Sequence, residues 1–191
     1  MSFTAAELAA IDEWASHAKP LTEVWFRSVP ARWMDPSEVL NGQGTAMHGG
    51  RFAPQGTRAV YLSATDQVAT AEVTGRKSRL GGSALITVDK YPRIVFGVEV
   101  SLDRVLEFGR RSMPKILQAF IAPCLDEDSH EASMDLGREM ASRSIQGLRF
   151  PSSTGRGSNL VVYNENCGSS SLALVNLSQL MAKIRSIAGT S

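Results

Sequence analysis

The chain has 191 residues, of which 43% are hydrophobic and 20% charged, as in an ordinary globular protein. Its 20 basic and 19 acidic residues give a formal net charge of +1, so composition offers no electrostatic argument for direct binding to nucleic acid. No run approaches the roughly 20 apolar residues of a membrane span, and the N-terminus lacks the layout of a signal peptide. We therefore expect a cytoplasmic protein without a membrane association.

Cysteine and histidine are sparse. Cys124 and Cys167 show no metal-ligand spacing and are too few for a disulfide framework. The three histidines lie far apart in sequence and form no zinc motif. We expect both cysteines to be small buried or half-buried residues, and we expect no metal site.

Capping residues, β-branched runs and turn residues divide the chain into short helices and strands. Thr4 and Glu7 form a capping box at the start of the first helix. In the helix predicted over residues 112–122, we expect Ile116, Leu117 and Phe120 on the buried side. The pattern predicts helices over residues 4–18, 65 or 66 to about 75, 102–108, 112–122, 131–145 and 178–188. It predicts strands over residues 23–29, 59–63, 83–89, 93–101, 148–150, 159–164 and 172–176. Residues 31–45 are expected to form a loop with one helical turn. This mixture indicates an α+β fold in a single domain.

Glu72 lies in the middle of the apolar face of a predicted helix. At 100° per residue, the mean direction of the surrounding apolar side chains falls within roughly 15° of Glu72. A carboxylate in that position is costly unless it is paired, so Glu72 is either a site residue or the partner of Arg76 four positions later. The apolar side chains are those of Val68, Ala69, Ala71 and Val73.

Arg27 and Tyr61 project from two predicted strands. Arg27 shares a strand face with Trp25. It either binds an anion from a rigid strand, or its aliphatic chain packs on Trp25 with the guanidinium in water. Tyr61 shares its face with Ala59 and Ser63, which suits a ligand wall as well as an ordinary half-buried tyrosine.

Arg51 follows the glycine pair Gly49 and Gly50, which allows the backbone to approach a ligand closely. A guanidinium at this position can hold a phosphate or a carboxylate, or it can be a solvated loop arginine. Residues 154–159 form a second glycine-rich stretch, which lacks the lysine of a P-loop and is expected to be a rim loop or hairpin.

Several short segments, in a fixed order along the chain, carry a family resemblance. In this order and spacing they resemble the RES domain, the toxin half of bacterial RES–Xre toxin–antitoxin pairs. The arginine, glutamate and serine that name the family correspond to Arg27, Glu72 and Ser152, with Ser153 as the alternative serine, and Phe52 stands where the family usually has tryptophan. The segments are Trp25-Phe26-Arg27, Gly49-Gly50-Arg51-Phe52, Val60-Tyr61-Leu62-Ser63, Ala71-Glu72, Phe150-Pro151-Ser152 and Asn159-Leu160-Val161.

The resemblance implies a fold similar to ADP-ribosyltransferases, with a split β-sheet core and surrounding helices. The resemblance covers roughly residues 23–176. We expect a RES domain with a C-terminal helix over residues 21–191 and an N-terminal helical extension over residues 1–20. The resemblance also implies that NAD+ is bound as a substrate, with no metal, and cleaved at its nicotinamide–ribose bond.

Roles for individual residues follow from the same resemblance. Glu72 would stabilise the positive charge that develops on the ribose, and Arg27 and Arg51 would bind the pyrophosphate or the adjoining ribose. Tyr61 would stack on nicotinamide, and Ser152 or Ser153 would hydrogen-bond to Glu72, the ribose or the amide.

The resemblance further implies an Xre-type helix-turn-helix antitoxin as the partner. ADP-ribose would pass to water, to phosphate or to a protein acceptor. One alternative is a strict protein mono-ADP-ribosyltransferase that acts on a phosphoribosyl pyrophosphate synthetase. A third interpretation is a non-catalytic interaction module in which Glu72 and Arg76 form an ordinary ion pair.

Overall fold

The computed structural model describes residues 3–33, 35–78, 92–126 and 129–176, with residues 74–78 described by their backbone alone. The strand predicted over 83–89 and the helix predicted over 178–188 lie outside these ranges. None of the helices within them has the length and apolar character needed to cross a bilayer. The elements are α1 (Ala5–Ser16), β1 (Lys19–Pro30), the 3-10 helix η1 (Ala31–Trp33), α2 (Pro36–Val39), α3 (Gln43–His48), β2 (Ala59–Ser63), α4 (Asp66–Ser78), β3 (Arg93–Glu107), η2 (Lys115–Phe120), α5 (Ile121–Leu125), α6 (Glu131–Ser142), β4 (Gly147–Pro151), β5 (Ser158–Tyr163), η3 (Asn164–Asn166) and β6 (Leu172–Leu174).

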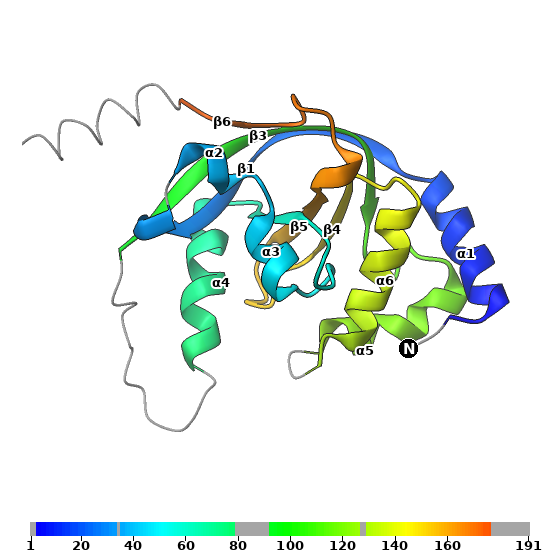
Figure 1. Ribbon diagram of the computed structural model, residues 1–191. Coiled ribbons are helices and arrows are strands. Elements are labelled where there is room, and N and C mark those ends of the chain that lie inside the picture. The colour runs from blue at the N-terminus through cyan, green and yellow to red at the C-terminus, as the bar shows by residue number, and fades with distance from the viewer. Residues whose placement is uncertain (1–2, 34, 79–91, 127–128, 177–191) are drawn as a thin grey trace, which may run out of the picture.

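The six described strands form one mixed sheet in the order β1-β2-β5-β4-β3-β6, and β1 also pairs with β3. The pairings from β1 through β2, β5, β4 and β3 back to β1 therefore close into a ring. In Figure 1 the long antiparallel pair β1–β3 arches over the molecule, with α4 below one end and α1, α5 and α6 below the other. The resemblance implied a split sheet, whereas the described strands form one continuous sheet, which the β1–β3 pairing closes.

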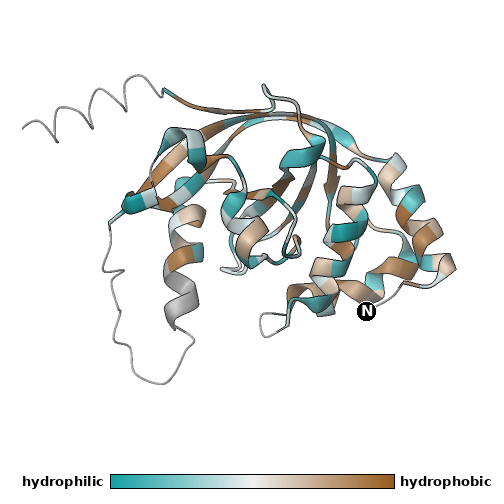
Figure 2. Cartoon of the chain, viewed as in Figure 1, coloured by the Kyte–Doolittle hydropathy of each residue, from teal (hydrophilic) through white to brown (hydrophobic). Residues whose placement is uncertain are grey.

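Alternation along the strands gives the sheet two different faces. One face carries an apolar cluster built around Trp25, Leu62, Val98 and Leu160. The other face packs on the helices through a larger cluster, and Figure 2 shows hydrophobic colour along the strands and mixed colours on the helices. The larger cluster includes Ile11 and Trp14 of α1, Leu136 and Met140 of α6, Phe52, Leu148 and Val161.

The short helix predicted over residues 102–108 is wrong, because β3 continues to Glu107. Leu102 and Leu106 are buried whereas Asp103 and Arg104 are exposed. The strand is extended by partners distant in sequence: its last residues pair with β4 in parallel, Val105 lying opposite Gly147, and Val105 pairs with Lys19 of β1 on the other side. These long-range ladders override the local helical signal of residues 102–108.

The helix predicted over residues 112–122 is replaced by two short ones, η2 and α5. Leu117 is fully buried as expected, and Phe120 packs against the larger cluster. Ile116, predicted to be buried, is 47% exposed. In a 3-10 helix the side chains at i and i+3 eclipse, so Leu117 and Phe120 lie on the same face and Ile116 points about 120° away from it.

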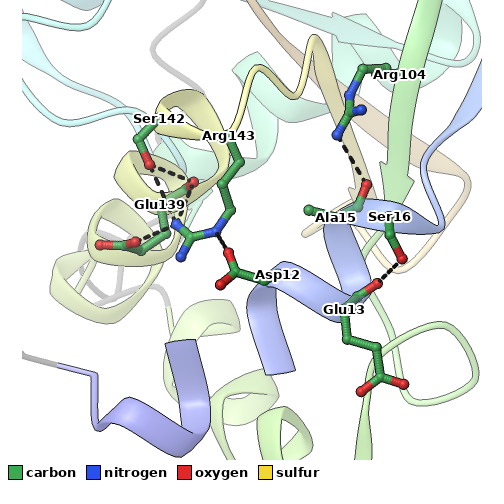
Figure 3. Close-up of polar contacts among 8 residues, drawn as sticks. All are labelled: Asp12, Glu13, Ala15, Ser16, Arg104, Glu139, Ser142 and Arg143. Atoms are coloured by element: carbon green, nitrogen blue, oxygen red, sulfur yellow. Dashed lines mark hydrogen bonds and ion pairs between the residues drawn. The ribbon is translucent and has the colours of Figure 1, made fainter. Parts of the chain in front are cut away.

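Helix α1 is integrated into the fold although it lies in the segment expected to be an extension. Its apolar face belongs to the larger cluster, and Figure 3 shows polar contacts that fasten it to its neighbours. Arg143, at the end of α6, donates to Asp12 over 2.6 Å and also contacts Glu139. Arg104 of β3 donates to the Ala15 carbonyl over 3.1 Å.

Helix α6 approaches the segment between α3 and β2 very closely at Gly137. A Cβ at that position would lie 1.9 Å from the Phe52 carbonyl oxygen, which also accepts a hydrogen bond from the Tyr163 hydroxyl. Glycine is therefore required for this contact, which holds the residues that follow Arg51 against the core.

Candidate active site

A cavity of about 720 Å³ opens on the face of the sheet opposite the Trp25 cluster. This volume is in the range of sites for small molecules and cofactors. The cavity lies between the sheet and α4, and the segments after α3 and β4 complete its walls. It is lined by Phe26, Ser28, Thr45, Gly49, Gly50, Arg51, Tyr61, Ser63, Ala69, Glu72, Val73, Arg93, Leu125, Phe150, Pro151, Ser152, Ser153 and Asn159.

Glu72 reaches the cavity from α4, and its carboxylate accepts hydrogen bonds from three residues. Oε1 accepts from the Ser152 hydroxyl over 2.6 Å and from Asn159 Nδ2 over 2.7 Å. Ser153 donates its backbone N–H to Oε1 and its hydroxyl to Oε2, each over 3.0 Å. Desolvation by burial raises the pKa of Glu72, but the hydrogen bonds from these three residues together hold it below its ordinary value of 4.5. Glu72 is therefore an anion at neutral pH.

This environment differs from the apolar surroundings expected for Glu72. Val68 and Ala69 of α4 are buried as expected, while the carboxylate turns to the polar donors of the sheet and the β4–β5 connection. The side chain of Arg76 lies outside the part of the chain that the structure describes, so an ion pair with it stays untested.

The connection from β4 to β5 folds into a tight turn that presents Ser152 and Ser153 to Glu72. Gly155 and Gly157 have φ angles of +75° and +68°, in the left-handed region that favours glycine. The Ser152 N–H donates to the Gly157 carbonyl over 3.2 Å, which closes the turn. Both serines contact Glu72, so the glycine-rich stretch contributes to the site by positioning them.

Tyr61 forms a wall of the cavity from β2. Its hydroxyl accepts a hydrogen bond from the Phe52 N–H over 3.0 Å, and its ring makes an edge contact with Phe150 at 6.4 Å between centroids. A Cβ on Gly50 would lie 2.7 Å from the Tyr61 hydroxyl oxygen, so Gly50 leaves the room that the tyrosine occupies. The ring is thus fixed in place before any ligand arrives.

Arg51 lines the cavity next to Gly49 and Gly50. Its Nη1 donates to the Cys124 carbonyl over 3.2 Å, which ties the Arg51 segment to α5. Burial raises the pKa of the Cys124 thiol to about 12, although the nearby Arg51 charge opposes this. The thiol is therefore protonated at neutral pH and, as expected, belongs to the core.

Arg27 is the one proposed site residue that does not line the cavity. It lies on the opposite strand face with Trp25, and its Nη1 donates to the Tyr61 carbonyl over 3.1 Å. Its Nε is buried without a hydrogen-bond partner among the described residues. Burial first, and the charge of Arg93 second, lower the pKa of Arg27 to about 10, so it stays a cation at neutral pH.

Ser63, Arg93 and Asn159 are cavity residues for which the sequence indicated no chemical role of their own. Arg93 begins β3 and is held by Ser28, which accepts from its Nε over 3.0 Å and from its Nη2 over 2.9 Å. Asn159 and Ser63 face each other across the β2–β5 ladder. The polar strand face that Ser63 shares with Tyr61 indicated that Ser63 could line a site. The sequence did not show that Ser63 pairs with Asn159, because the two residues lie almost 100 positions apart.

The cavity combines one carboxylate anion, a fixed aromatic ring, hydroxyl donors and guanidinium cations. Such a set can bind an anionic ligand and stabilise a developing positive charge next to the carboxylate. Within the described ranges, no group of three or more His, Cys, Asp or Glu side chains could hold a metal ion.

Comparison with protein families decides the relationship. Residues 24–179 match the RES domain, a span that runs from β1 past β6 and holds every residue of the cavity. The chain belongs to the RES domain family. Its α1 precedes the matched RES region.

A solved structure with the same fold comes from the MbcT–MbcA toxin–antitoxin complex of M. tuberculosis. The match has a TM-score of 0.72 at 20% identity and covers 92% of each chain. At this identity the likeness shows a common fold. A search of curated protein sequences found no significant match.

Proposed function

We propose that this RES domain protein is the toxin of a toxin–antitoxin system and that it binds NAD+ and cleaves the nicotinamide–ribose bond. The observation that carries the proposal is the Glu72 carboxylate, held as an anion in a cavity whose walls include Tyr61 and Arg51. Membership of the RES family and the fold shared with a chain of a toxin–antitoxin complex support it.

The proposed reaction needs an anion next to the ribose. When the bond between ribose C1′ and the nicotinamide nitrogen breaks, the electron pair leaves with nicotinamide and the ribose becomes oxocarbenium-like. A preorganised carboxylate stabilises that charge without reorganising during the reaction. In this proposal Glu72 supplies the carboxylate, and Ser152 and Ser153 hold it in place.

The other side chains bind the substrate. Tyr61 stacks on nicotinamide. Its ring is already held in place against Gly50 and Phe52, so it needs no rearrangement to do so. Arg51 binds the pyrophosphate or the adjoining ribose by charge-assisted hydrogen bonds. Arg27 adds positive charge from behind the sheet and braces the strand that carries Tyr61 through its bond to the Tyr61 carbonyl.

The ADP-ribosyl group then passes to water, phosphate or a protein, and a helix-turn-helix antitoxin controls the toxin by blocking the cavity. The experiment that tests the activity is mass spectrometry of the products formed from NAD+ by purified protein, with and without phosphate and candidate acceptor proteins. Release of nicotinamide is expected, and the accompanying product identifies the acceptor.

A second test uses cells. Expression of the protein without an antitoxin is expected to arrest growth and lower cellular NAD+, and Glu72→Gln is expected to abolish both effects. Normal growth with unchanged NAD+ and no ADP-ribosylated protein would refute the enzymatic proposal and favour the interaction module.

A further inference from the structure

Ser63 and Asn159 form a polar pair directly behind Glu72. They lie opposite each other in the β2–β5 ladder, and each is 7% exposed. The Ser63 hydroxyl donates to Asn159 Oδ1 over 2.8 Å, and Asn159 Nδ2 donates to Glu72 Oε1 over 2.7 Å. Neither group can ionise, so the pair cannot serve as an acid or base at neutral pH.

The direction of these hydrogen bonds is fixed by the carboxylate. An ionised carboxylate can only accept, so the amide must turn its Nδ2 to Glu72 and its Oδ1 to Ser63. Ser63 must then donate its single hydroxyl proton to the amide. Each member of the chain thus sets the orientation of the next.

The same contacts make the two oxygens of Glu72 unequal. Among the described residues, Oε1 accepts from Ser152, the Ser153 backbone and Asn159, whereas Oε2 accepts from the exposed Ser153 hydroxyl. A carboxylate oxygen has about two lone-pair directions, so three donors saturate Oε1. Oε2 retains accepting capacity.

We propose that Asn159, oriented by Ser63, is a positioning residue that anchors Glu72 Oε1 and thereby leaves Oε2 as the oxygen that meets the ribosyl cation. This assignment rests on the proposed NAD+ cleavage. It gives a structural reason for a polar pair at two buried strand positions, where β-branched apolar residues would ordinarily pack.

The test measures Glu72 directly in the full chain. The carboxyl carbon of Glu72 is titrated by 13C NMR, with the signal assigned by its absence from Glu72→Gln. Nicotinamide release from NAD+ is followed as a function of pH on the same preparations. The variants are Asn159→Ala, Ser63→Ala and the control Asn164→Ala, which removes an amide that donates to the Leu40 carbonyl over 2.8 Å outside the cavity.

In Asn159→Ala the carboxylate loses a donor that favours its charged form, so its titration and the acid limb of kcat are expected to move up by about one pH unit. The kcat is expected to fall roughly tenfold or more at neutral pH, with a smaller change in KM for NAD+. Ser63→Ala should shift the Glu72 titration and the acid limb of kcat in the same direction, but by a smaller amount. Asn164→Ala should leave the Glu72 titration and the kcat unchanged.

The outcomes separate the two proposals. A Glu72 signal that titrates in Asn159→Ala as in the wild type would overturn the positioning role, even if NAD+ is cleaved. A shift equal to that of Asn164→Ala would also overturn it, because the effect would then be a general loss of structure. If the wild type releases no nicotinamide, NAD+ cleavage fails, while the NMR titration still decides whether Asn159 anchors Glu72.

Discussion

Glu72 is subject to two opposing effects that decide its charge. Burial disfavours the anion, and four hydrogen bonds from Ser152, Ser153 and Asn159 favour it, with the hydrogen bonds dominating. A helix-centre glutamate that sequence alone makes costly to the fold is therefore accommodated by donors from elsewhere in the chain. Its position on α4 and a hydrogen bond from Ser152 or Ser153 were expected from the sequence, whereas the contact from Asn159 was not, since it depends on how β5 aligns with β2.

The first prediction concerns turnover. Glu72→Gln keeps the side-chain shape but removes the charge, so NAD+ turnover is expected to fall by about two to three orders of magnitude. A nicotinamide-release assay measures this, with Glu13→Gln on the exposed surface of α1 as the control that keeps wild-type turnover. Full activity of Glu72→Gln would show that the glutamate has a structural role only.

The pH dependence of stability gives a second prediction at the same residue. Because the folded-state pKa of Glu72 lies below 4.5, its ionised form stabilises the fold above that pH, and the contribution is lost as the pH falls through the lowered value. The wild type should be more stable than Glu72→Gln near neutral pH, with the difference shrinking below about pH 4.5. Urea unfolding of both proteins from pH 3 to 7 measures this, and a difference that grows on acidification contradicts it.

Ser152 and Ser153 are expected to differ although they are adjacent. The Ser152 hydroxyl is buried, contacts Thr154 and binds the saturated oxygen, whereas Ser153 is exposed and retains its backbone donor after truncation. Ser152→Ala should lower kcat by roughly tenfold or more, the scale of one hydrogen bond to a charged group, and Ser153→Ala should lower it less. Steady-state kinetics of the two variants would contradict this ranking if Ser153→Ala were the more damaged.

At the scale of elements, alternation and capping predicted most helices and strands. The end of β3 is held as a strand by β1 and β4, and η2 is followed directly by α5 where one helix was expected. At the end of β3, contacts between segments distant in sequence determine the local structure. The sequence pattern contains only the local part of that information.

The close approach of α6 to Phe52 makes a prediction about elements. A Cβ on Gly137 meets the Phe52 carbonyl, whereas a Cβ on Gly44 of α3 meets nothing within 4 Å. Gly137→Ala is expected to destabilise the protein by about 1–3 kcal/mol and to lower turnover, because the Phe52 N–H holds Tyr61. Gly44→Ala should be neutral or stabilising by up to about 1 kcal/mol.

Chemical denaturation and nicotinamide release on both glycine variants provide the measurement. Equal effects from Gly137→Ala and Gly44→Ala would indicate a general preference for glycine in these helices. The close contact between α6 and Phe52 would then not determine the position of Tyr61.

At the scale of the whole molecule, the ring of strands separates a cavity face from a face filled by the Trp25 cluster. Helix α1 precedes the matched RES region but closes the far end of the core, fastened by the contact between Arg143 and Asp12. The α+β class and the segments of the site could be read from the sequence. The side of the sheet on which Arg27 acts could not be assigned, because strand alternation gives its face but not which face bears the cavity.

A double-mutant cycle tests the fastening of α1. The pair formed by Asp12 and Arg143 is largely exposed on the aspartate side, so the coupling between Asp12→Ala and Arg143→Ala should be about 0.2–1 kcal/mol. Turnover should be unchanged in both single variants because the pair is remote from the cavity. Denaturation at low and high salt measures the coupling, and a coupling insensitive to salt would contradict a surface ion pair.

The hydrogen-bond donors of Glu72 come from residues 152–159, which lie 80 to 87 positions after the glutamate itself. During protein synthesis the chain is made from the N-terminus and folds as domains become available. A ribosome that has passed Glu72 has therefore made the carboxylate but none of the groups that orient it, and β5 must also emerge before Asn159 can pair with Ser63. The nascent chain consequently stays without an assembled site until late in translation.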